Sequence, residues 1–122
     1  MPQKIVFMGT PEFSVPILES LINSNHKILS VYSQPPSKSS RGQKITPSTV
    51  ELFSKKNSLN LRTPTNLDTD EEFNFLRSLN PDFVIVVAYG KIIPKRFLEL
   101  SKHGFYNIHA SILPKWRGAA PI

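Results

Sequence analysis

The alternation of apolar and mixed segments along the chain predicts an α/β fold. Short apolar runs at 4–8, 28–32 and 82–88 are typical of buried strands. The run at 82–88 is the strongest of the three, because it is apolar on both faces and rich in β-branched residues, as strands in the centre of a parallel sheet are. Between the first two runs, apolar residues recur at helical spacing from Ile17 to Ile22.

The remaining elements are predicted from shorter signals. Ser14 can cap the first helix, whose first turn tolerates Pro16. The stretch 33–46 is polar and rich in Pro, Ser and Lys, so it is expected to lack regular structure. Other expected elements are helices at 47–56, from Asp68 or Thr69 to about 79, and at 95–100, with strands at 59–62 and 104–109.

This order of elements implies one domain built on a doubly wound, mostly parallel sheet with right-handed crossovers, a Rossmann-like arrangement. Ligands of such sheets bind at the carboxyl ends of the strands. Gly9, the pair Tyr89-Gly90, and His109 all fall at predicted strand ends. We therefore expect three chemically distinctive positions to converge on one crevice.

Asn107 and His109 are the strongest candidates for catalytic residues. They lie two apart on a predicted strand, so their side chains point the same way. An amide donor and a titratable imidazole aimed at one atom can stabilise a developing oxyanion and handle its proton. No carboxylate follows Glu99 to orient the imidazole. His26 and His103 lack such neighbours, and we assign both to the surface.

Composition narrows the class of protein. The chain has 122 residues, of which 39% are hydrophobic, as in a globular domain, and it has no cysteine. A disulfide framework and a thiolate metal site are thereby excluded, and a reducing cytoplasm is the expected location. No apolar run reaches the length of a membrane span, and the N-terminus lacks a signal-peptide pattern. We expect neither a membrane nor a metal as a partner.

The formal net charge of +6 is unevenly distributed. Two stretches contain basic residues and no acid, one between Glu19 and Glu51 and the other after Glu99. Such stretches suggest an anionic partner such as nucleic acid. On charge alone, an ordinary solvated surface is the favoured explanation.

Three motifs together resemble those of the methionyl-tRNA formyltransferases. They are Phe-Met-Gly-Thr-Pro-Glu-Phe at 7–13, Val-Val-Ala-Tyr-Gly-Lys-Ile-Ile-Pro at 86–94, and the segment 107–122 that begins Asn-Ile-His. The resemblance covers the whole chain in order and corresponds to the N-terminal part of that family's catalytic domain. It implies that the rest of the catalytic domain and a C-terminal β-barrel domain lie outside residues 1–122, so this segment alone is expected to be inactive.

The resemblance implies transfer of a formyl group from 10-formyltetrahydrofolate to the α-amine of methionyl initiator tRNA in translation initiation. Asn107 and His109 would be two of three catalytic residues, with an aspartate beyond Ile122 as the third. Gly9 and Thr10 would belong to the substrate loop. The residues implied to contact the folate are Ala88, Tyr89, Gly90, Ser111, Ile112, Leu113 and Pro114, where Ile112 replaces the family's usual Leu.

The basic stretch 33–46 separates this family from related formyltransferases that act on small substrates. The resemblance implies that this stretch enters the acceptor arm of the tRNA. Arg41 would lead it and Lys38 and Lys44 would flank it, since a guanidinium can bridge phosphates or stack on a base. Two alternatives stay open, namely a formyltransferase for a sugar nucleotide or other small amine, and a non-catalytic module that binds folate or a nucleotide.

Overall fold

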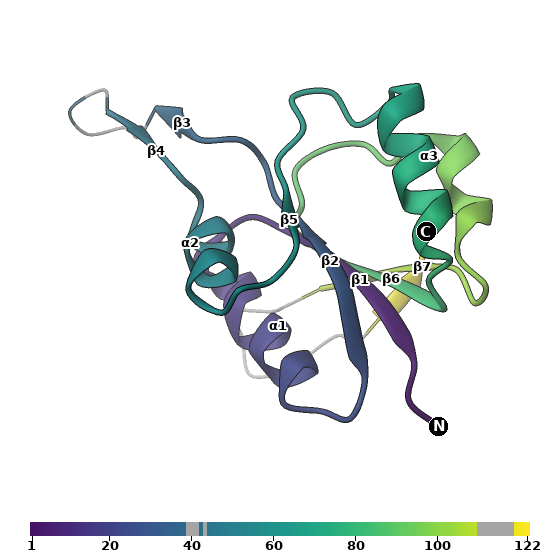
Figure 1. The fold of residues 1–122 in the computed structure, drawn as a ribbon. Coiled ribbons are helices and arrows are strands. Elements are labelled where there is room, and N and C mark those ends of the chain that lie inside the picture. Colours follow the sequence, from purple (N-terminus) through teal and green to yellow (C-terminus); the bar gives the residue numbers. More distant parts are fainter. Residues whose placement is uncertain (39–41, 43, 110–118) are drawn as a thin grey trace.

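A computed structural model of the chain describes residues 1–38, 42, 44–109 and 119–122. Its main sheet contains strands β1 (Lys4–Gly9), β2 (Lys27–Tyr32), β5 (Leu61–Arg62), β6 (Phe83–Val87), β7 (Phe105–Ile108) and β8 (Ala119–Pro121). Their order across the sheet is β5-β2-β1-β6-β7-β8, and only the β7–β8 pairing is antiparallel (Figure 1). The doubly wound, mostly parallel sheet predicted from the sequence is confirmed.

Helices cover both faces of this sheet (Figure 1). They are α1 (Val15–Ile22), α2 (Thr49–Lys56) and α3 (Asp70–Leu79), with 3-10 helices η1 (Glu12–Ser14) and η2 (Lys95–Leu100). One face of β1 presents Phe7 to Leu18 of α1 and Val50 of α2. Because side chains alternate along a strand, β1 fills a second core layer with the opposite face.

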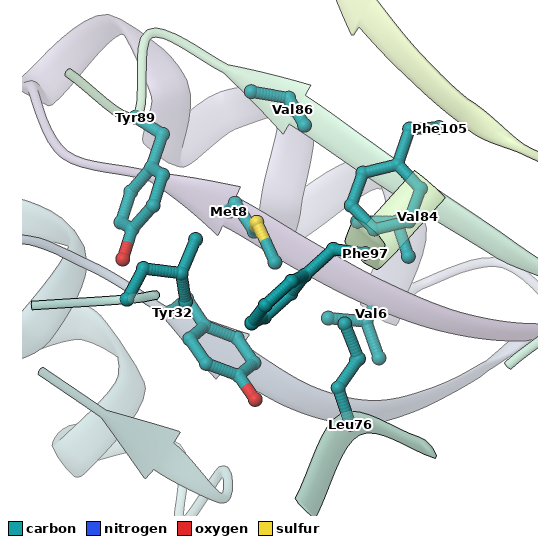
Figure 2. Packing of buried hydrophobic residues seen from close by; sticks show 10 residues of the cluster. Val6, Met8, Tyr32, Leu76, Val84, Val86, Tyr89, Phe97 and Phe105 are labelled. Carbon is teal, nitrogen blue, oxygen red and sulfur yellow. The ribbon is translucent and has the colours of Figure 1, made fainter. Parts of the chain in front are cut away.

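The second core layer lies between the sheet and the pair α3 and η2. Val6 and Met8 of β1 pack there with Leu76 of α3 and Phe97 of η2 (Figure 2). All four side chains are fully buried. Burying a side chain of this size contributes about 1.5–3 kcal/mol to stability, so two such layers hold β1 and its neighbours firmly in register.

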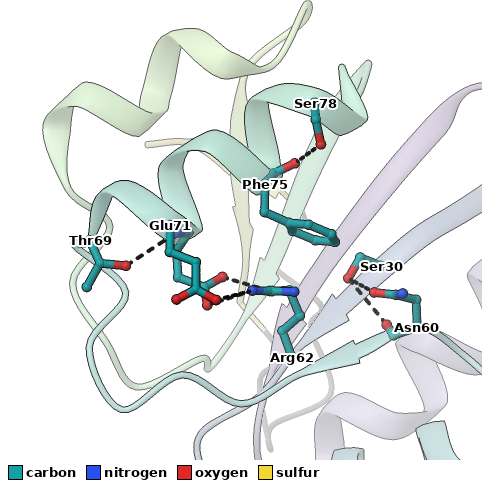
Figure 3. Close-up of polar contacts among 8 residues, drawn as sticks. Ser30, Asn60, Arg62, Thr69, Glu71, Phe75 and Ser78 are labelled. Atoms are coloured by element: carbon teal, nitrogen blue, oxygen red, sulfur yellow. Dashed lines mark hydrogen bonds and ion pairs between the residues drawn. The ribbon is translucent and has the colours of Figure 1, made fainter.

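Polar contacts fix α3 against the outer strand β5. Thr69 caps the helix, because its hydroxyl accepts the Glu72 N–H at 3.2 Å. The Arg62 guanidinium donates to both carboxylate oxygens of Glu72, at 2.8 and 3.1 Å, and lies 3.9 Å from the centre of the Phe75 ring (Figure 3). The hydrogen bond to Glu72 raises the pKa of Arg62, so the guanidinium keeps its charge. The cap at Thr69 was one of the two starts predicted from the sequence.

Three expectations about local structure are wrong. The stretch 33–46 contains an antiparallel pair, β3 (Ser37–Lys38) with β4 (Ile45–Thr46), where no regular structure was expected. A further strand, β8, follows the one taken as the last, because the chain turns back to pair with β7. The Ser14 side chain does not cap α1. Its hydroxyl donates to the Val87 carbonyl at 2.7 Å instead, since η1 runs directly into α1 and leaves Ser14 helical.

Candidate functional site

The carboxyl ends of β1, β6 and β7 lie side by side at one edge of the sheet. Gly9 at the end of β1 is paired with Val87 at the end of β6. On the other side of β6, Val86 is paired with Asn107 of β7. The three positions that the sequence placed at strand ends therefore share one edge of the sheet, and their convergence on a single crevice stays a prediction.

Asn107 and His109 face each other at this edge. Asn107 lies within β7, half-buried, with its backbone held between Val86 of β6 and Ala120 of β8. The exposed His109 follows the strand, and its Nε2 is 3.4 Å from Nδ2 of Asn107. Among the described residues, no carboxylate contacts this imidazole. The amide and the imidazole can thus both donate a hydrogen bond to the same oxygen of a bound substrate.

The turn after β6 has an unusual backbone. Ala88 (φ 51°) and Gly90 (φ 88°) both adopt left-handed conformations, with Tyr89 between them. A left-handed conformation costs a non-glycine residue such as Ala88 about 1–2 kcal/mol, so the surroundings must hold it there. Ala88 and Gly90 are exposed, and they leave their backbone accessible at the carboxyl edge.

The side chain of Tyr89 lies in the core, whereas its backbone lies at the edge of the sheet. Its ring is fully buried beside Met8 and Tyr32, as Figure 2 shows, and its hydroxyl has no hydrogen-bond partner in the part of the chain that the structure describes. Burial raises the pKa of this hydroxyl, with a smaller contribution from the Glu72 carboxylate. The Tyr89 carbonyl points outward to polar partners, since Thr10 Oγ1 donates to it at 2.7 Å and Gln34 Nε2 at 3.2 Å. Only the backbone of Tyr89 is therefore available at the edge.

Two clefts open near this turn. The first, of about 310 Å³, lies at the ends of β1 and β2 and is lined by Thr10, Pro11, Gln34, Pro35, Ser37 and the segment 46–49. The second, of about 350 Å³, is lined by residues 65–68 and by Gly90, Lys91 and Ile92. Its two walls are tied together by Lys91, whose Nζ donates to the Thr65 carbonyl at 2.8 Å. Thr10 and Gly90, both singled out from the sequence, thus line different clefts.

Lys38 and Lys44, two of the predicted tRNA-contacting residues, belong to the β3–β4 hairpin, which projects away from the sheet (Figure 1). Lys38 ends β3, Lys44 precedes β4, and both are exposed. Arg41, and the predicted folate-contacting residues Ser111, Ile112, Leu113 and Pro114, lie outside the described residues.

Gln34 is a residue at this edge that the sequence analysis missed. It follows β2 and bonds the Tyr89 carbonyl from 55 positions away, a contact for which no local pattern exists. A polar residue just after a buried strand was the one available signal.

In the described part of the chain, no group of three His, Cys, Asp or Glu side chains is arranged to hold a metal ion. No helix described there is long and apolar enough to cross a membrane.

Comparison with known families decides the assignment. Residues 3–122 match the family described as formyl transferase. The chain belongs to this family.

Solved structures support the formyl transferase fold. Phosphoribosylglycinamide formyltransferase from Bacillus halodurans has a TM-score of 0.61 at 15% identity over 95% of this chain and 60% of its own. Formyltetrahydrofolate deformylase from Burkholderia mallei has a TM-score of 0.59 at 16% identity over 97% of this chain and 41% of its own.

More similar sequences come from curated formyl transferases. The methionyl-tRNA formyltransferase of Pelagibacter ubique is 58% identical over the whole chain, which covers 40% of that protein. The methionyl-tRNA formyltransferase of Caulobacter vibrioides is 49% identical over 98% of the chain, which covers 39% of that protein. The chain therefore spans about 40% of the length of the curated relatives it matches.

Proposed function

We propose that the complete gene product transfers a formyl group from 10-formyltetrahydrofolate to the α-amine of methionyl initiator tRNA. The observation that carries this proposal is the facing pair Asn107 and His109, on the open edge of a formyl transferase fold. The name of the Pelagibacter ubique relative, at 58% identity, supports methionyl-tRNA as the acceptor.

The reaction needs the groups that the pair supplies. The α-amine of the methionyl ester attacks the formyl carbon, a C–N bond forms, and negative charge develops on the formyl oxygen. Nδ2 of Asn107 and the imidazole of His109 donate hydrogen bonds to that oxygen. The C–N bond to the folate then breaks, and the proton released by the amine passes to the departing folate nitrogen. His109 is the group at this edge that can carry that proton.

The exposed backbone of the turn 88–90 suits a formyl donor. A pteridine is a flat ring with a polar edge, and such rings are held by backbone N–H and C=O groups beside apolar side chains. Ala88 and Gly90 are exposed at the edge of the sheet that also carries the candidate pair, and the nearby Ile92 is 92% exposed and offers apolar surface. These residues, with 111–114, are our proposed donor site.

The β3–β4 hairpin, called the basic hairpin below, is the proposed contact with the tRNA. It carries the exposed Lys38 and Lys44 beside the first cleft, and the acid-free stretch from Pro35 to Val50 includes Arg41. Lysine and arginine neutralise backbone phosphates, which supplies affinity and orientation.

Steady-state kinetics of the complete gene product test this function and its alternatives. The donor is 10-formyltetrahydrofolate, and the acceptors are methionyl initiator tRNA, methionyl elongator tRNA and an amino-sugar nucleotide. We expect formylation of the initiator tRNA to be preferred. Preferred turnover of the amino-sugar nucleotide would establish a small-amine formyltransferase, and folate binding without turnover of any acceptor would establish a binding module.

A further inference from the structure

The turn after β6 is held by side chains from two neighbouring strand ends. Thr10, just after β1, donates from Oγ1 to the Tyr89 carbonyl at 2.7 Å. Gln34, just after β2, donates from Nε2 to the same carbonyl at 3.2 Å. The Gln34 backbone N–H also donates to Thr10 Oγ1 at 3.3 Å, which closes a ring of three residues. We call this ring the Thr10–Gln34–Tyr89 latch.

The backbone of the turn fits this latch closely. Tyr89 lies between the left-handed residues Ala88 and Gly90, so its carbonyl is presented toward Thr10 and Gln34. A Cβ added to Gly90 would collide with Nε2 of Gln34. Glycine at this position therefore satisfies both the positive φ and the approach of the Gln34 amide. The Tyr89 carbonyl is fully engaged, and the exposed backbone of Ala88 and Gly90 is left for a ligand.

The latch lies next to the candidate catalytic pair. In the sheet, β6 runs between β1 and β7, with Gly9 opposite Val87 and Asn107 opposite Val86. Since β6 ends at Val87, the turn that starts at Ala88 leaves the sheet between the ends of β1 and β7. The latch also separates the two clefts, because Thr10 and Gln34 line the first and Gly90 lines the second. A displacement of the turn would therefore also alter the proposed binding site of the formyl group.

We propose that Gln34 and Thr10 are positioning residues for formyl transfer, because they fix the backbone turn 88–90 against which the formyl donor binds beside Asn107 and His109. This inference rests on the proposed function. The role of both side chains is to bond the Tyr89 carbonyl, so neither touches the reacting atoms. A displacement of about 1 Å in such a wall can reduce turnover on the order of a hundredfold.

Isosteric variants of the complete gene product test the latch by kinetics. Thr10→Val and Gln34→Met remove the donors and keep the volume, whereas Thr10→Ser keeps the hydroxyl. We expect kcat/KM for 10-formyltetrahydrofolate to fall about tenfold or more in the first two and to be largely restored in Thr10→Ser, while KM for methionyl-tRNA changes less than about twofold. Ser101→Ala is the matched control, because Ser101 Oγ also donates to backbone carbonyls, those of Asp82 and Gly104, at the opposite edge of the sheet.

Hydrogen exchange supplies a readout that does not depend on activity. Amides of residues 88–92 should exchange several-fold faster in Thr10→Val and Gln34→Met, and those of 83–87 should not. Unchanged exchange, equal losses in Thr10→Ser and Thr10→Val, or a change in the KM for tRNA alone would overturn the inference. A wild-type protein that does not formylate methionyl-tRNA would instead overturn the proposed function, and exchange would still show whether these side chains hold the turn.

Discussion

The amide of Asn107 and the imidazole of His109 face each other at the end of β7, with Nδ2 and Nε2 3.4 Å apart. The separation is slightly long for a strong hydrogen bond between the two groups. It leaves both free to turn toward a third atom, which in the proposed reaction is the formyl oxygen. Their function is therefore expected to appear in the transition state and not in the binding of either substrate.

Replacing either residue by alanine in the complete gene product should reduce kcat and leave KM nearly unchanged. Removal of one donor to a developing oxyanion typically costs about 10²–10³ in kcat. We expect losses of at least that size for Asn107→Ala and His109→Ala. His103→Ala is the matched control, since that exposed imidazole packs on Phe83, 5.0 Å away between ring centres. A variant that weakened substrate binding and kept kcat would remove the residue from the catalytic assignment.

The hydroxyls of Tyr32 and Tyr89 give a prediction about stability. Both are buried without a hydrogen-bond partner among the described residues, and an orphaned buried polar group costs about 1–3 kcal/mol. Tyr32→Phe and Tyr89→Phe should therefore leave the free energy of unfolding unchanged or raise it by up to about 1 kcal/mol. Urea denaturation at neutral pH measures this. A clear loss of stability in either variant would show that its hydroxyl has a partner, such as a buried water.

The same two hydroxyls predict a response to alkaline pH. Burial is the main cause that raises the pKa of both well above the usual value of 10.0, so the folded state retains protons that the unfolded chain releases. The stabilisation is complete below about pH 10 and is lost as the pH rises above it. The free energy of unfolding of the wild-type protein should fall between about pH 10 and 11.5, and less steeply in the Tyr32→Phe/Tyr89→Phe double variant. Equal slopes in the two proteins would contradict this.

Gly9 is expected to be intolerant of a side chain. A Cβ at this position would lie 2.8 Å from the Val87 carbonyl oxygen and 2.8 Å from Cε2 of Phe7. The carbonyl belongs to the pairing of β1 with β6 and cannot move freely. Gly9→Ala should destabilise the protein by about 1–3 kcal/mol through overpacking, measured as a lower midpoint of thermal unfolding. An unchanged midpoint would show that the edge of the sheet adapts.

Local patterns were sufficient to predict the sheet and the proximity of the Asn107 and His109 side chains. The run at 82–88, which is apolar on both faces, indicated a central strand, and β6 is indeed flanked by β1 and β7. Asn107 and His109 could be paired because strand side chains repeat every two residues, a spacing visible in the sequence. The registers of β1, β6 and β7 then brought Gly9 to the same edge.

Contacts between distant segments were not predicted from the sequence. The hairpin β3–β4 pairs only Ser37 with Thr46 and Lys38 with Ile45, too few residues to give an alternating pattern. Ser14 was expected to bond its own helix, but a buried carbonyl 73 positions away accepts its hydroxyl. Gln34 likewise bonds a residue that only the folded sheet brings near. Polar side chains take the partner that tertiary structure offers, and sequence spacing does not reveal that partner.

The basic hairpin supports the last prediction, which separates a tRNA enzyme from a formyltransferase of small amines. Lys38 and Lys44 are exposed on a hairpin that projects beside the first cleft, and Arg41 belongs to the same stretch. If the two lysines contact phosphates, each should contribute close to one unit to the slope of log affinity against log salt. The Lys38→Ala/Lys44→Ala variant should then bind initiator tRNA more weakly at low salt, and the difference should diminish as salt is raised.

Arg41→Ala should behave differently if the guanidinium stacks on a base or bridges phosphates. Such a contact is only partly electrostatic, so kcat/KM for initiator tRNA should stay reduced at high salt, while binding of 10-formyltetrahydrofolate is unaffected. Lys102→Ala is the control, because this exposed lysine lies at the amino-terminal edge of the sheet, where its backbone N–H bonds Pro81. Kinetics with initiator tRNA across a salt series decide the point. If kcat/KM of the hairpin variants equalled that of the wild type at every salt concentration, the hairpin would be ordinary solvated surface, and a small amine would become the preferred acceptor.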